Sequence, residues 1–185
     1  MTIVLIGASG AGKSVIENEI THSGYKKIIS YTTRKARPGE INGKDYYFIS
    51  NETFREMLND GLFAEYEEYS QGRYYGTLVS DYADMGENKV VVLTPGGFRQ
   101  LLRKVPRKQF YAVLVQANLG TRVKRYIDRC GDLFNFDDMN EINARVNRDF
   151  GMFLGIERDV DFIVQNNEDK QIKDIVTEIF NEQKK

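Results

Sequence analysis

The sequence predicts an α/β fold with a parallel central sheet. Short apolar runs rich in β-branched residues occur at 2–6, 89–93 and 110–115, and segments with helical apolar spacing lie between them. Apolar runs of this length suit strands buried on both faces, and their alternation with helices is typical of parallel sheets. Between about 31 and 84, tyrosines, charges and glycines replace the aliphatic runs, which indicates a mixed α/β lobe inserted into the core.

The apolar pattern also places the other elements of the first half. After the strand at 2–6 and a glycine-rich break at 7–12, we expect a helix at 13–22 and a short strand at 27–30. Inside the inserted segment we expect strands at 44–49 and 62–69 and a helix at 51–60. Asn51 is the expected N-cap of that helix, because Asn side chains accept hydrogen bonds from the first free N–H groups.

The second half follows the same alternation. We expect helices at 97–104 and 120–129, a polar aromatic stretch from Cys130 to Met139, a long helix at 139–157, a buried strand at 162–164 and a closing helix at 168–182. This assigns 1–30 and 85–185 to the core and 31–84 to the inserted lobe.

Composition excludes several classes of protein. The 185 residues suit one domain, or one domain carrying a small lobe. The net charge of −1 disfavours a nucleic-acid binder, and the apolar runs are too short to cross a membrane. Cys130 is the only cysteine and no basic n-region opens the chain, so we expect a cytoplasmic protein without a signal peptide.

The glycine-rich break carries the first functional motif. Residues 7–14, GASGAGKS, fit the phosphate-binding pattern G-x-x-x-x-G-K-[ST] between a strand and a helix. Its glycines let backbone N–H groups surround a phosphate at a helix N-terminus. Lys13 is expected to reach the β- and γ-phosphates of ATP, and Ser14 to ligate Mg²⁺ as the cofactor. The expected ATP-binding residues are Gly7, Ala8, Ser9, Gly10, Ala11, Gly12, Lys13, Ser14 and Val15.

A second anion site is indicated by the stretch from Tyr31 to Phe48. It holds four Lys or Arg residues with hydroxyl side chains between them, and it lacks the apolar period of a helix or strand. Arg34 and Arg37, three residues apart, suit bidentate binding of a phosphate, to which tyrosine hydroxyls add directional bonds. A solvated basic hairpin is the alternative interpretation.

Four segments then show a resemblance to the guanylate kinases, a family of nucleoside monophosphate kinases. They are 30–40 (SYTTRKARPGE), 43–48 (GKDYYF), 63–66 (FAEY) and 74–77 (YYGT), which occur in the family's order. The resemblance implies a P-loop NTPase three-layer fold with a helical lid, and phosphoryl transfer from ATP to GMP or dGMP. It assigns the phosphate of the monophosphate to Arg34, Arg37, Tyr46 and Tyr75, and the guanine edge to Ser30, Glu65 and Thr77.

The resemblance also implies a lid at about 126–148, with arginines that fold over the phosphates. Arg125, Arg129 and Arg145 match best and Arg148 less well; with Lys13 and Arg34, the first three complete the expected catalytic set. A solvated helix face paired with acidic neighbours is the alternative. Asn166, after the last strand, resembles a residue near the adenine base.

The chain departs from the family's pattern after residues 89–93. The family has a D-x-D sequence there, whereas this chain reads Thr94-Pro95-Gly96. Thr94, expected to contact the substrate, can offer an oxygen, but neither acidic position is filled. The lid segment is also longer and carries Phe134 and Phe136. Two alternatives stay open: a kinase with a different or relaxed base specificity, and a binding module without catalysis. The expected partners are small nucleotides, without nucleic acid or membrane, and the chain is expected to be a monomer or homodimer.

Overall fold

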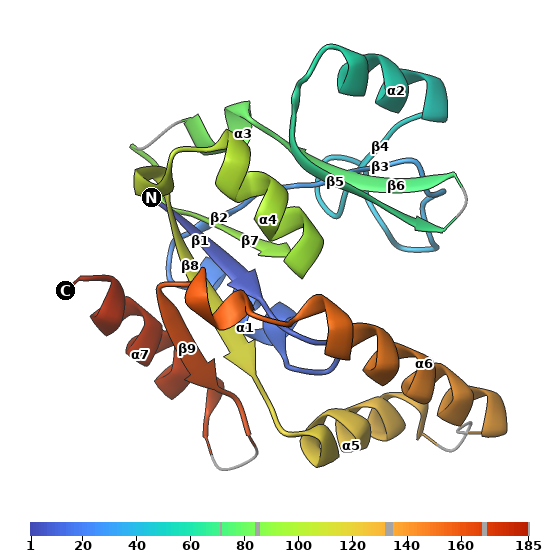
Figure 1. The fold of residues 1–185 in the computed structure, drawn as a ribbon, viewed down its shortest axis with the longest axis vertical. Helices are drawn as coiled ribbons and strands as arrows, with labels where there is room; N and C mark the ends of the chain where they lie inside the picture. Colours follow the sequence, from blue (N-terminus) through green and yellow to red (C-terminus); the bar gives the residue numbers. More distant parts are fainter. Residues whose placement is uncertain (71, 84–85, 132–134, 168–169, 185) are drawn as a thin grey trace.

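The structure, a computed structural model, describes residues 1–70, 72–83, 86–131, 135–167 and 170–184. At positions 69, 70, 136, 141, 145, 148 and 150 it describes only the backbone. Five parallel strands form the central sheet in the order β2-β7-β1-β8-β9 (Figure 1). Their bounds are β1 Thr2–Ile6, β2 Lys26–Lys27, β7 Lys89–Leu93, β8 Phe110–Gln116 and β9 Phe162–Gln165. The predicted α/β fold with a parallel sheet is confirmed.

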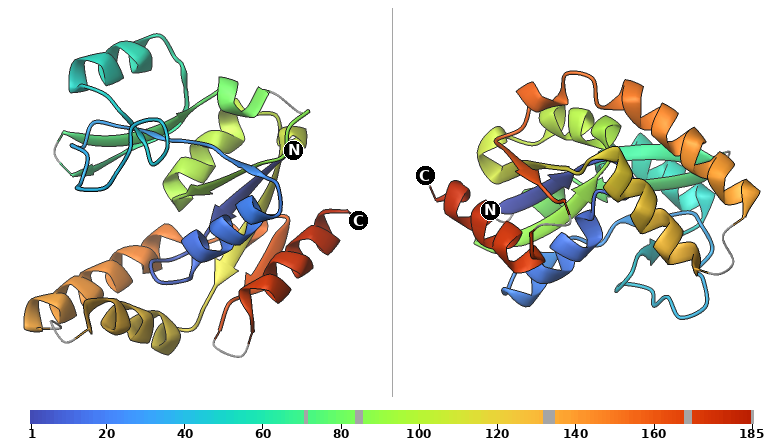
Figure 2. Two further views of the ribbon diagram at one scale, coloured as in Figure 1. Left: turned by 180° about the vertical axis from the view of Figure 1, so that it is seen from behind. Right: turned by 90° about the horizontal axis from the view of Figure 1, so that it is seen from below.

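Two helical layers cover this sheet. Helices α1 (Lys13–His22) and α7 (Ile172–Gln183) pack on one face, and α4 (Pro95–Lys104) packs on the other (Figure 2). Strand β1 shows why both layers are needed, since successive side chains of a strand point to opposite faces. Ile3 and Leu5 join the cluster under α1 and α7, while Val4 and Ile6 join the cluster under α4.

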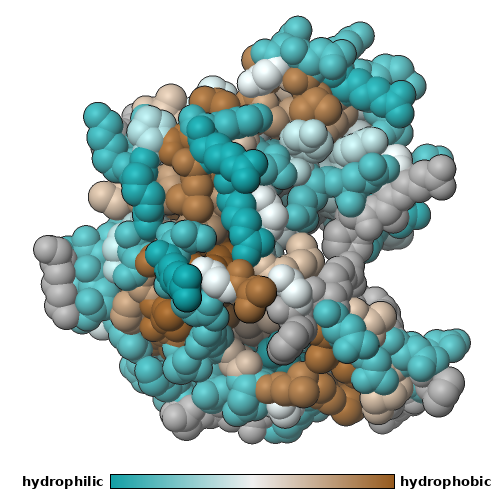
Figure 3. Space-filling model, in the orientation of Figure 1, coloured by the Kyte–Doolittle hydropathy of each residue, from teal (hydrophilic) through white to brown (hydrophobic). Residues whose placement is uncertain are grey.

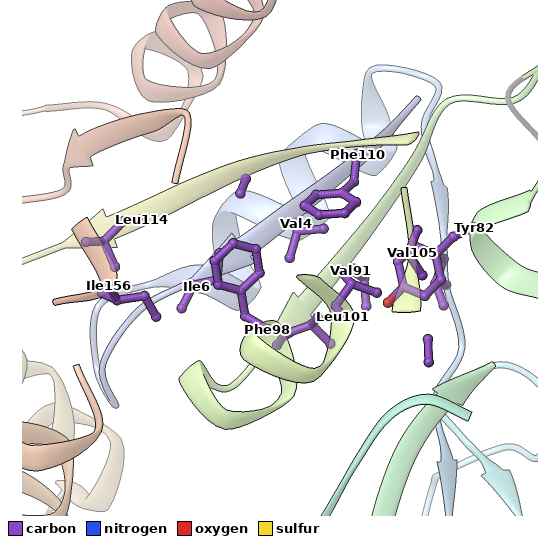
Figure 4. Close-up of a cluster of buried hydrophobic side chains, with 14 residues drawn as sticks. Val4, Ile6, Tyr82, Val91, Phe98, Leu101, Val105, Phe110, Leu114 and Ile156 are labelled. Carbon is purple, nitrogen blue, oxygen red and sulfur yellow. The ribbon is translucent and has the colours of Figure 1, made fainter. Parts of the chain in front are cut away.

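The cluster under α4 anchors the elements that carry the functional residues (Figure 4). The rings of Phe98 and Phe110 meet edge to face at 6.2 Å, and Leu101 is fully buried beside them. Short 3-10 turns at Arg107–Gln109 and Ile156–Arg158 flank this layer, and Ile156 packs into it. Truncating a buried Phe to Ala costs about 3–5 kcal/mol, so this layer holds α4 firmly against the sheet.

The inserted segment forms a separate mixed sheet of four strands in the order β4-β3-β6-β5. These strands are β3 Tyr31–Thr32, β4 Tyr47–Phe48, β5 Phe63–Ser70 and β6 Arg73–Leu78, followed by the short helix α3 at Ser80–Ala83. Helix α2 (Asn51–Asn59) packs Phe54 on Phe63, with stacked rings 4.3 Å apart. The division into core, lobe and lid at the expected residue numbers stays a prediction.

The lobe corrects two local expectations. Ser50, not Asn51, caps α2: the Ser50 side chain accepts a hydrogen bond from the Thr53 N–H, and Asn51 is the first helical residue. Strands β3 and β6 were not expected from the sequence. Strand β6 contains Gly76, where a Cβ would lie 2.8 Å from Cδ1 of Phe63. Glycine has a low propensity for strands, but here it allows the two strands to pack closely.

A pair of helices, α5 (Leu119–Cys130) and α6 (Phe136–Met152), projects beyond the sheet (Figure 1). Helix α6 begins and ends earlier than the expected helix at 139–157. It begins at residue 136 because the Asn135 side chain and Asp138 form a capping box. The chain turns at Gly155, which has a positive φ of 76°. Within the described ranges, no helix has the length and apolar character that crossing a bilayer requires.

Candidate nucleotide-binding site

The expected site residues lie where the parallel strands end. The loop at 7–12 follows β1, Thr94 follows β7 and Asn166 follows β9. Ligands of open α/β sheets bind at this carboxyl edge. The surface is hollowed between the inserted lobe and the α5–α6 pair (Figure 3), and two neighbouring pockets occupy this region, one beside the glycine-rich loop and one under the lobe.

The glycine-rich loop adopts a conformation that requires its glycines. Gly10 and Gly12 have positive φ values of 79° and 92°, which side chains other than glycine rarely tolerate. Gly7 is required for space, because a Cβ there would overlap the carbonyl oxygen of Val115 on β8. The loop therefore curls tightly into α1 and presents backbone N–H groups at the helix N-terminus.

Lys13 lies folded back over this loop. Its Nζ donates to the carbonyl oxygens of Gly7 at 2.6 Å and Ala8 at 3.0 Å. Burial lowers the pKa of the Lys13 ammonium to about 8; the carboxylate of Asp149 opposes this shift and the guanidinium of Arg122 adds to it. The ammonium is thus still mainly charged at neutral pH, as phosphate binding requires. Ser14 and Val15 are both exposed in the first turn of α1.

Asp149 and Arg122, which were not predicted from the sequence, also contact the loop. The Ser9 N–H donates to Oδ2 of Asp149 on α6 at 3.2 Å, and Arg122 on α5 forms an ion pair with the same oxygen. Nε of Arg122 also donates to the Ser9 carbonyl at 2.7 Å. An anionic oxygen thus occupies a hydrogen-bonding position that the phosphate motif supplies. The distance of 27 residues between Arg122 and Asp149 left no local pattern to find.

Arg125 and Asn166 brace the loop. Arg125 donates to the carbonyl oxygens of Gly10 at 3.2 Å and Asn166 at 3.0 Å, and Nδ2 of Asn166 donates to the Ala11 carbonyl at 2.8 Å. A Cβ at Gly12 would overlap Nδ2 of Asn166, which is buried. The structure thus places both residues on the loop backbone, and their expected contacts with ATP stay predictions.

The other expected lid arginines belong to α5 and α6. Nε of Arg129 donates to the Arg125 carbonyl at 3.2 Å, and its guanidinium lies 5.4 Å from the centre of the Tyr126 ring. Arg129 also lines a small pocket beside Ser9 and Gly10. The side chains of Arg145 and Arg148 lie outside the described part of the structure, as do Phe134 and the side chain of Phe136.

The pocket under the lobe brings most of the expected acceptor residues together. Its volume is about 380 Å³. Six of the residues expected to bind the monophosphate line it: Ser30, Arg37, Tyr46, Glu65, Tyr75 and Thr94. Ser30 and Arg37 come from one segment of the chain and the other four from separate segments, so the pocket forms only when the lobe and core fold together. Thr94 also caps α4, because its Oγ1 accepts a hydrogen bond from the Gly97 N–H at 3.0 Å.

Arg34 supports this pocket through side-chain partners. It donates to both oxygens of Glu40 at 2.7 and 2.8 Å, and its Nε donates to the Tyr75 hydroxyl at 3.2 Å. The guanidinium lies 5.3 Å from the centre of the Tyr46 ring. Arg34 holds the pKa of Glu40 down at about 2, and Glu40 in turn raises the pKa of Arg34. This arrangement holds the tyrosines in place.

Glu65 is the buried acid of the pocket. Its Oε1 accepts a hydrogen bond from Thr77 Oγ1 at 2.8 Å, and Thr77 in turn lies 2.9 Å from the Tyr82 hydroxyl. A hydroxyl has one proton, so Thr77 donates to Glu65 and Tyr82 donates to Thr77. Burial raises the pKa of Glu65 to about 7, the Thr77 bond opposes this, and the charge of Glu67 adds to it. Thr77 is fully buried and thus acts on the pocket through Glu65.

Fold and site together define a P-loop nucleotide-binding protein with a second pocket for an anionic ligand. A family model for guanylate kinase matches residues 1–183. The chain therefore belongs to the guanylate kinase family, and the resemblance seen in the sequence is confirmed.

Individual relatives agree with this family. The chain is 34% identical over 174 residues to a guanylate kinase of Lactiplantibacillus plantarum, covering 91% of this chain and 81% of the relative. It is 38% identical over 112 residues to a guanylate kinase of Lactobacillus acidophilus, covering 57% and 54%. The match thus spans about half the length of the second relative.

A solved structure shows the same fold. The crystal structure of guanylate kinase from Anaplasma phagocytophilum superposes with a TM-score of 0.69 at 23% identity, covering 100% of this chain and 84% of that one. This agreement confirms the three-layer fold with its inserted mixed sheet.

Proposed function

We propose that the chain transfers the γ-phosphoryl group of ATP to GMP or dGMP. One observation carries this proposal: a pocket with a buried carboxylate at one side and phosphate-binding groups at the other adjoins the pocket that contains Lys13. Thr94 and Glu67 line both pockets. Two nucleotides bound in these pockets would bring their phosphates together, and membership of the guanylate kinase family supports this arrangement.

The base is selected by Glu65. Guanine presents its N1–H and N2–H donors side by side, and a carboxylate accepts both, whereas adenine lacks this pair. The hydrogen bonds from Tyr82 to Thr77 and from Thr77 to Glu65 hold the carboxylate in place. Ser30 lines the same pocket and supplies a further hydroxyl.

The phosphate of the monophosphate is held by Arg37, Tyr46 and Tyr75. All three line the acceptor pocket, and Nε of Arg34 donates a hydrogen bond to the Tyr75 hydroxyl. Charge-assisted hydrogen bonds from Arg and hydroxyl groups are the usual means of binding phosphate. Removing solvent from these groups strengthens their interaction with the charge that develops during transfer.

The glycine-rich loop fits the triphosphate of ATP. Its Ser9 N–H already binds the anionic oxygen of Asp149, and a Cβ at Gly7 or Gly12 would fill occupied space. Lys13 would exchange the carbonyls of Gly7 and Ala8 for phosphate oxygens. Ser14 would hold Mg²⁺ through its hydroxyl, and this ion supplies positive charge that neutralises the phosphates.

Closure of the lobe and lid would exclude water, because an open site would hydrolyse ATP. We assign residues 31–84 to the lobe and about 126–148 to the lid. Arg125, Arg129 and Arg145 are the expected lid cations. The cytoplasmic location and the monomeric or dimeric state stay predictions.

The test is ADP release from ATP and Mg²⁺ with GMP, dGMP, AMP, dAMP, CMP, UMP and dTMP in turn. We expect turnover with GMP and dGMP alone. Turnover with another base would support the relaxed-specificity alternative, which Thr94-Pro95-Gly96 in place of an acidic pair favours. No turnover, together with no ATP binding in calorimetry, would support the binding-module alternative.

A further inference from the structure

Glu67 occupies the junction of the two pockets. It lies on β5 two residues after Glu65, so both side chains point to the same face of the strand. Opposite them on β6 are Tyr75, paired with Glu67, and Thr77, paired with Glu65. Glu67 lines both the acceptor pocket and the pocket that contains Lys13.

Two glycines make room for these carboxylates. A Cβ at Gly96 would overlap Oε1 of Glu67, and a Cβ at Gly97 would lie 2.6 Å from Oε2 of Glu65. Neither glycine has a positive φ, so space and not backbone conformation requires them. The two carboxylates therefore lie against neighbouring positions in the first turn of α4, where a helix N-terminus favours negative charge.

Glu67 has unused hydrogen-bonding capacity. Among the described residues, its carboxylate has no hydrogen-bond or ion-pair partner, whereas Glu65 accepts a bond from Thr77. Two adjacent acids with free acceptor positions suit a ligand that offers several N–H donors at one edge. The charge of Glu67 also raises the pKa of Glu65, which such a ligand would relieve.

We propose that Glu67 is a specificity-determining residue that accepts the second N–H of the exocyclic amino group of guanine, while Glu65 accepts the N1–H and the first N–H of that amino group. Gly96 is the residue that admits the Glu67 carboxylate. This inference rests on the proposed function, because it concerns the base of the acceptor nucleotide. Glu67, from the inserted segment, thus supplies a carboxylate beside the end of β7, where the core continues with Thr94, Pro95 and Gly96.

The first experiment compares GMP with IMP, whose base lacks the amino group but keeps the N1–H. We expect Glu67→Ala to lower kcat/KM for GMP about tenfold or more, the loss of one hydrogen bond to a charged group. Because IMP makes no bond to Glu67, its kcat/KM stays within about twofold. Glu65→Ala lowers both. The control Glu56→Ala removes an exposed acid of α2 and changes neither.

A charge exchange separates recognition from structural support. Gly96→Asp alone places a side chain in space that Glu67 fills, so we expect a lower Tm and a loss of activity. Glu67→Ala together with Gly96→Asp returns a carboxylate to the vacated space. We expect this double variant to recover the preference for GMP over IMP to within about fivefold of the original chain, which repacking alone would not restore.

The outcomes distinguish this inference from the proposed function. If the unaltered chain neither phosphorylates nor binds GMP in calorimetry, both fail. If it phosphorylates GMP but the GMP-to-IMP ratio is unchanged in Glu67→Ala, only the role of Glu67 is wrong. An equal loss for both nucleotides also overturns it, and would indicate that Glu67 orders a hydrated cation or supports the fold.

Discussion

The donor loop and the acceptor pocket are built in opposite ways. The loop at 7–14 is one continuous segment whose backbone does the binding, and its glycines set the shape. The acceptor pocket is assembled from side chains of both sheets, among them Ser30, Glu65, Tyr75 and Thr94. A backbone site tolerates any phosphate, whereas a side-chain site selects one base. On the proposed function, the glycine-rich loop therefore supplies affinity for phosphate, and the acceptor pocket recognises the substrate.

Their polar groups also differ in how they are satisfied. In the loop, Lys13 and the Ser9 N–H are already bonded to protein oxygens, which bound ATP would replace on the proposed function. In the acceptor pocket, Glu65 keeps one oxygen outside its bond to Thr77 and has a raised pKa. On the proposed function, ATP binding is thus an exchange of partners, whereas the acceptor adds hydrogen bonds to a carboxylate that Thr77 already holds.

The largest effect should come from the donor side. Lys13→Ala removes the cation that we propose meets the transferred group, and we expect kcat to fall about 1,000-fold because such a charge stabilises the transition state. A steady-state assay with saturating ATP and GMP measures it. Lys108→Ala, which removes an exposed lysine, is the control and leaves kcat unchanged. A loss below tenfold for Lys13→Ala would contradict the assignment.

The acceptor side should respond in specificity. Glu65→Gln keeps the shape of the side chain but replaces one acceptor oxygen with a donor that faces the guanine N–H groups. We expect kcat/KM for GMP to fall about 100-fold, while the KM for ATP stays within about twofold. Initial rates measured over a range of GMP concentrations, and then over a range of ATP concentrations, give both constants. Equal increases in the KM for GMP and the KM for ATP would show that Glu65 acts on both nucleotides and not on the acceptor alone.

The raised pKa of Glu65 predicts a pH dependence of stability. Its pKa is about 7 in the folded chain and 4.5 as the ordinary value, so the folded state binds more protons between these limits. The unfolding free energy therefore falls as pH rises from about 4.5 to 7, by at most about 3 kcal/mol. Glu67, Lys104 and Tyr82 also face this group. Urea unfolding at pH 5 and pH 8 tests it.

The matched variant for that measurement is Glu65→Gln, which cannot titrate. We expect its stability to change less than that of the unaltered chain between pH 5 and pH 8. Glu56→Gln, on the exposed surface of α2, should follow the unaltered chain. Identical pH profiles for all three proteins would show that Glu65 is ionised normally.

The smallest expected effect concerns Asp149, whose carboxylate lies where phosphate should bind. Asp149→Asn removes a charge that repels ATP and frees Arg122, so we expect the Kd for ATP at pH 6.5 to fall about fivefold. The change also removes a charge that raises the pKa of Lys13. The gain should therefore shrink at pH 8.5, and calorimetry at both values measures it. Weaker ATP binding at pH 6.5 would show that Asp149 supports the loop.

The difference between a contiguous loop and an assembled pocket explains which features could be predicted from the sequence. The strand, loop and helix from 2 to 22 were predicted with their observed bounds, because each depends on neighbouring residues. Strand β6 was missed, because Gly76 is required there by the Glu65 carbonyl oxygen and the Phe63 ring of the adjacent strand, which the sequence does not show. Asn51 was chosen over Ser50 as the N-cap because both are good caps, and one residue of helix phase decides between them.

The sequence by itself determined the fold class, the family and the phosphate loop, because periodicity and a contiguous motif are local properties of the chain. Only the tertiary structure brought Arg122 and Asp149 onto Ser9, and placed Glu67 against Gly96. These pairs are separated by 27 or more residues and follow no fixed spacing. Their chemistry depends on burial and on distances of a few ångströms, which arise when the lobe, the sheet and the α5–α6 pair pack together.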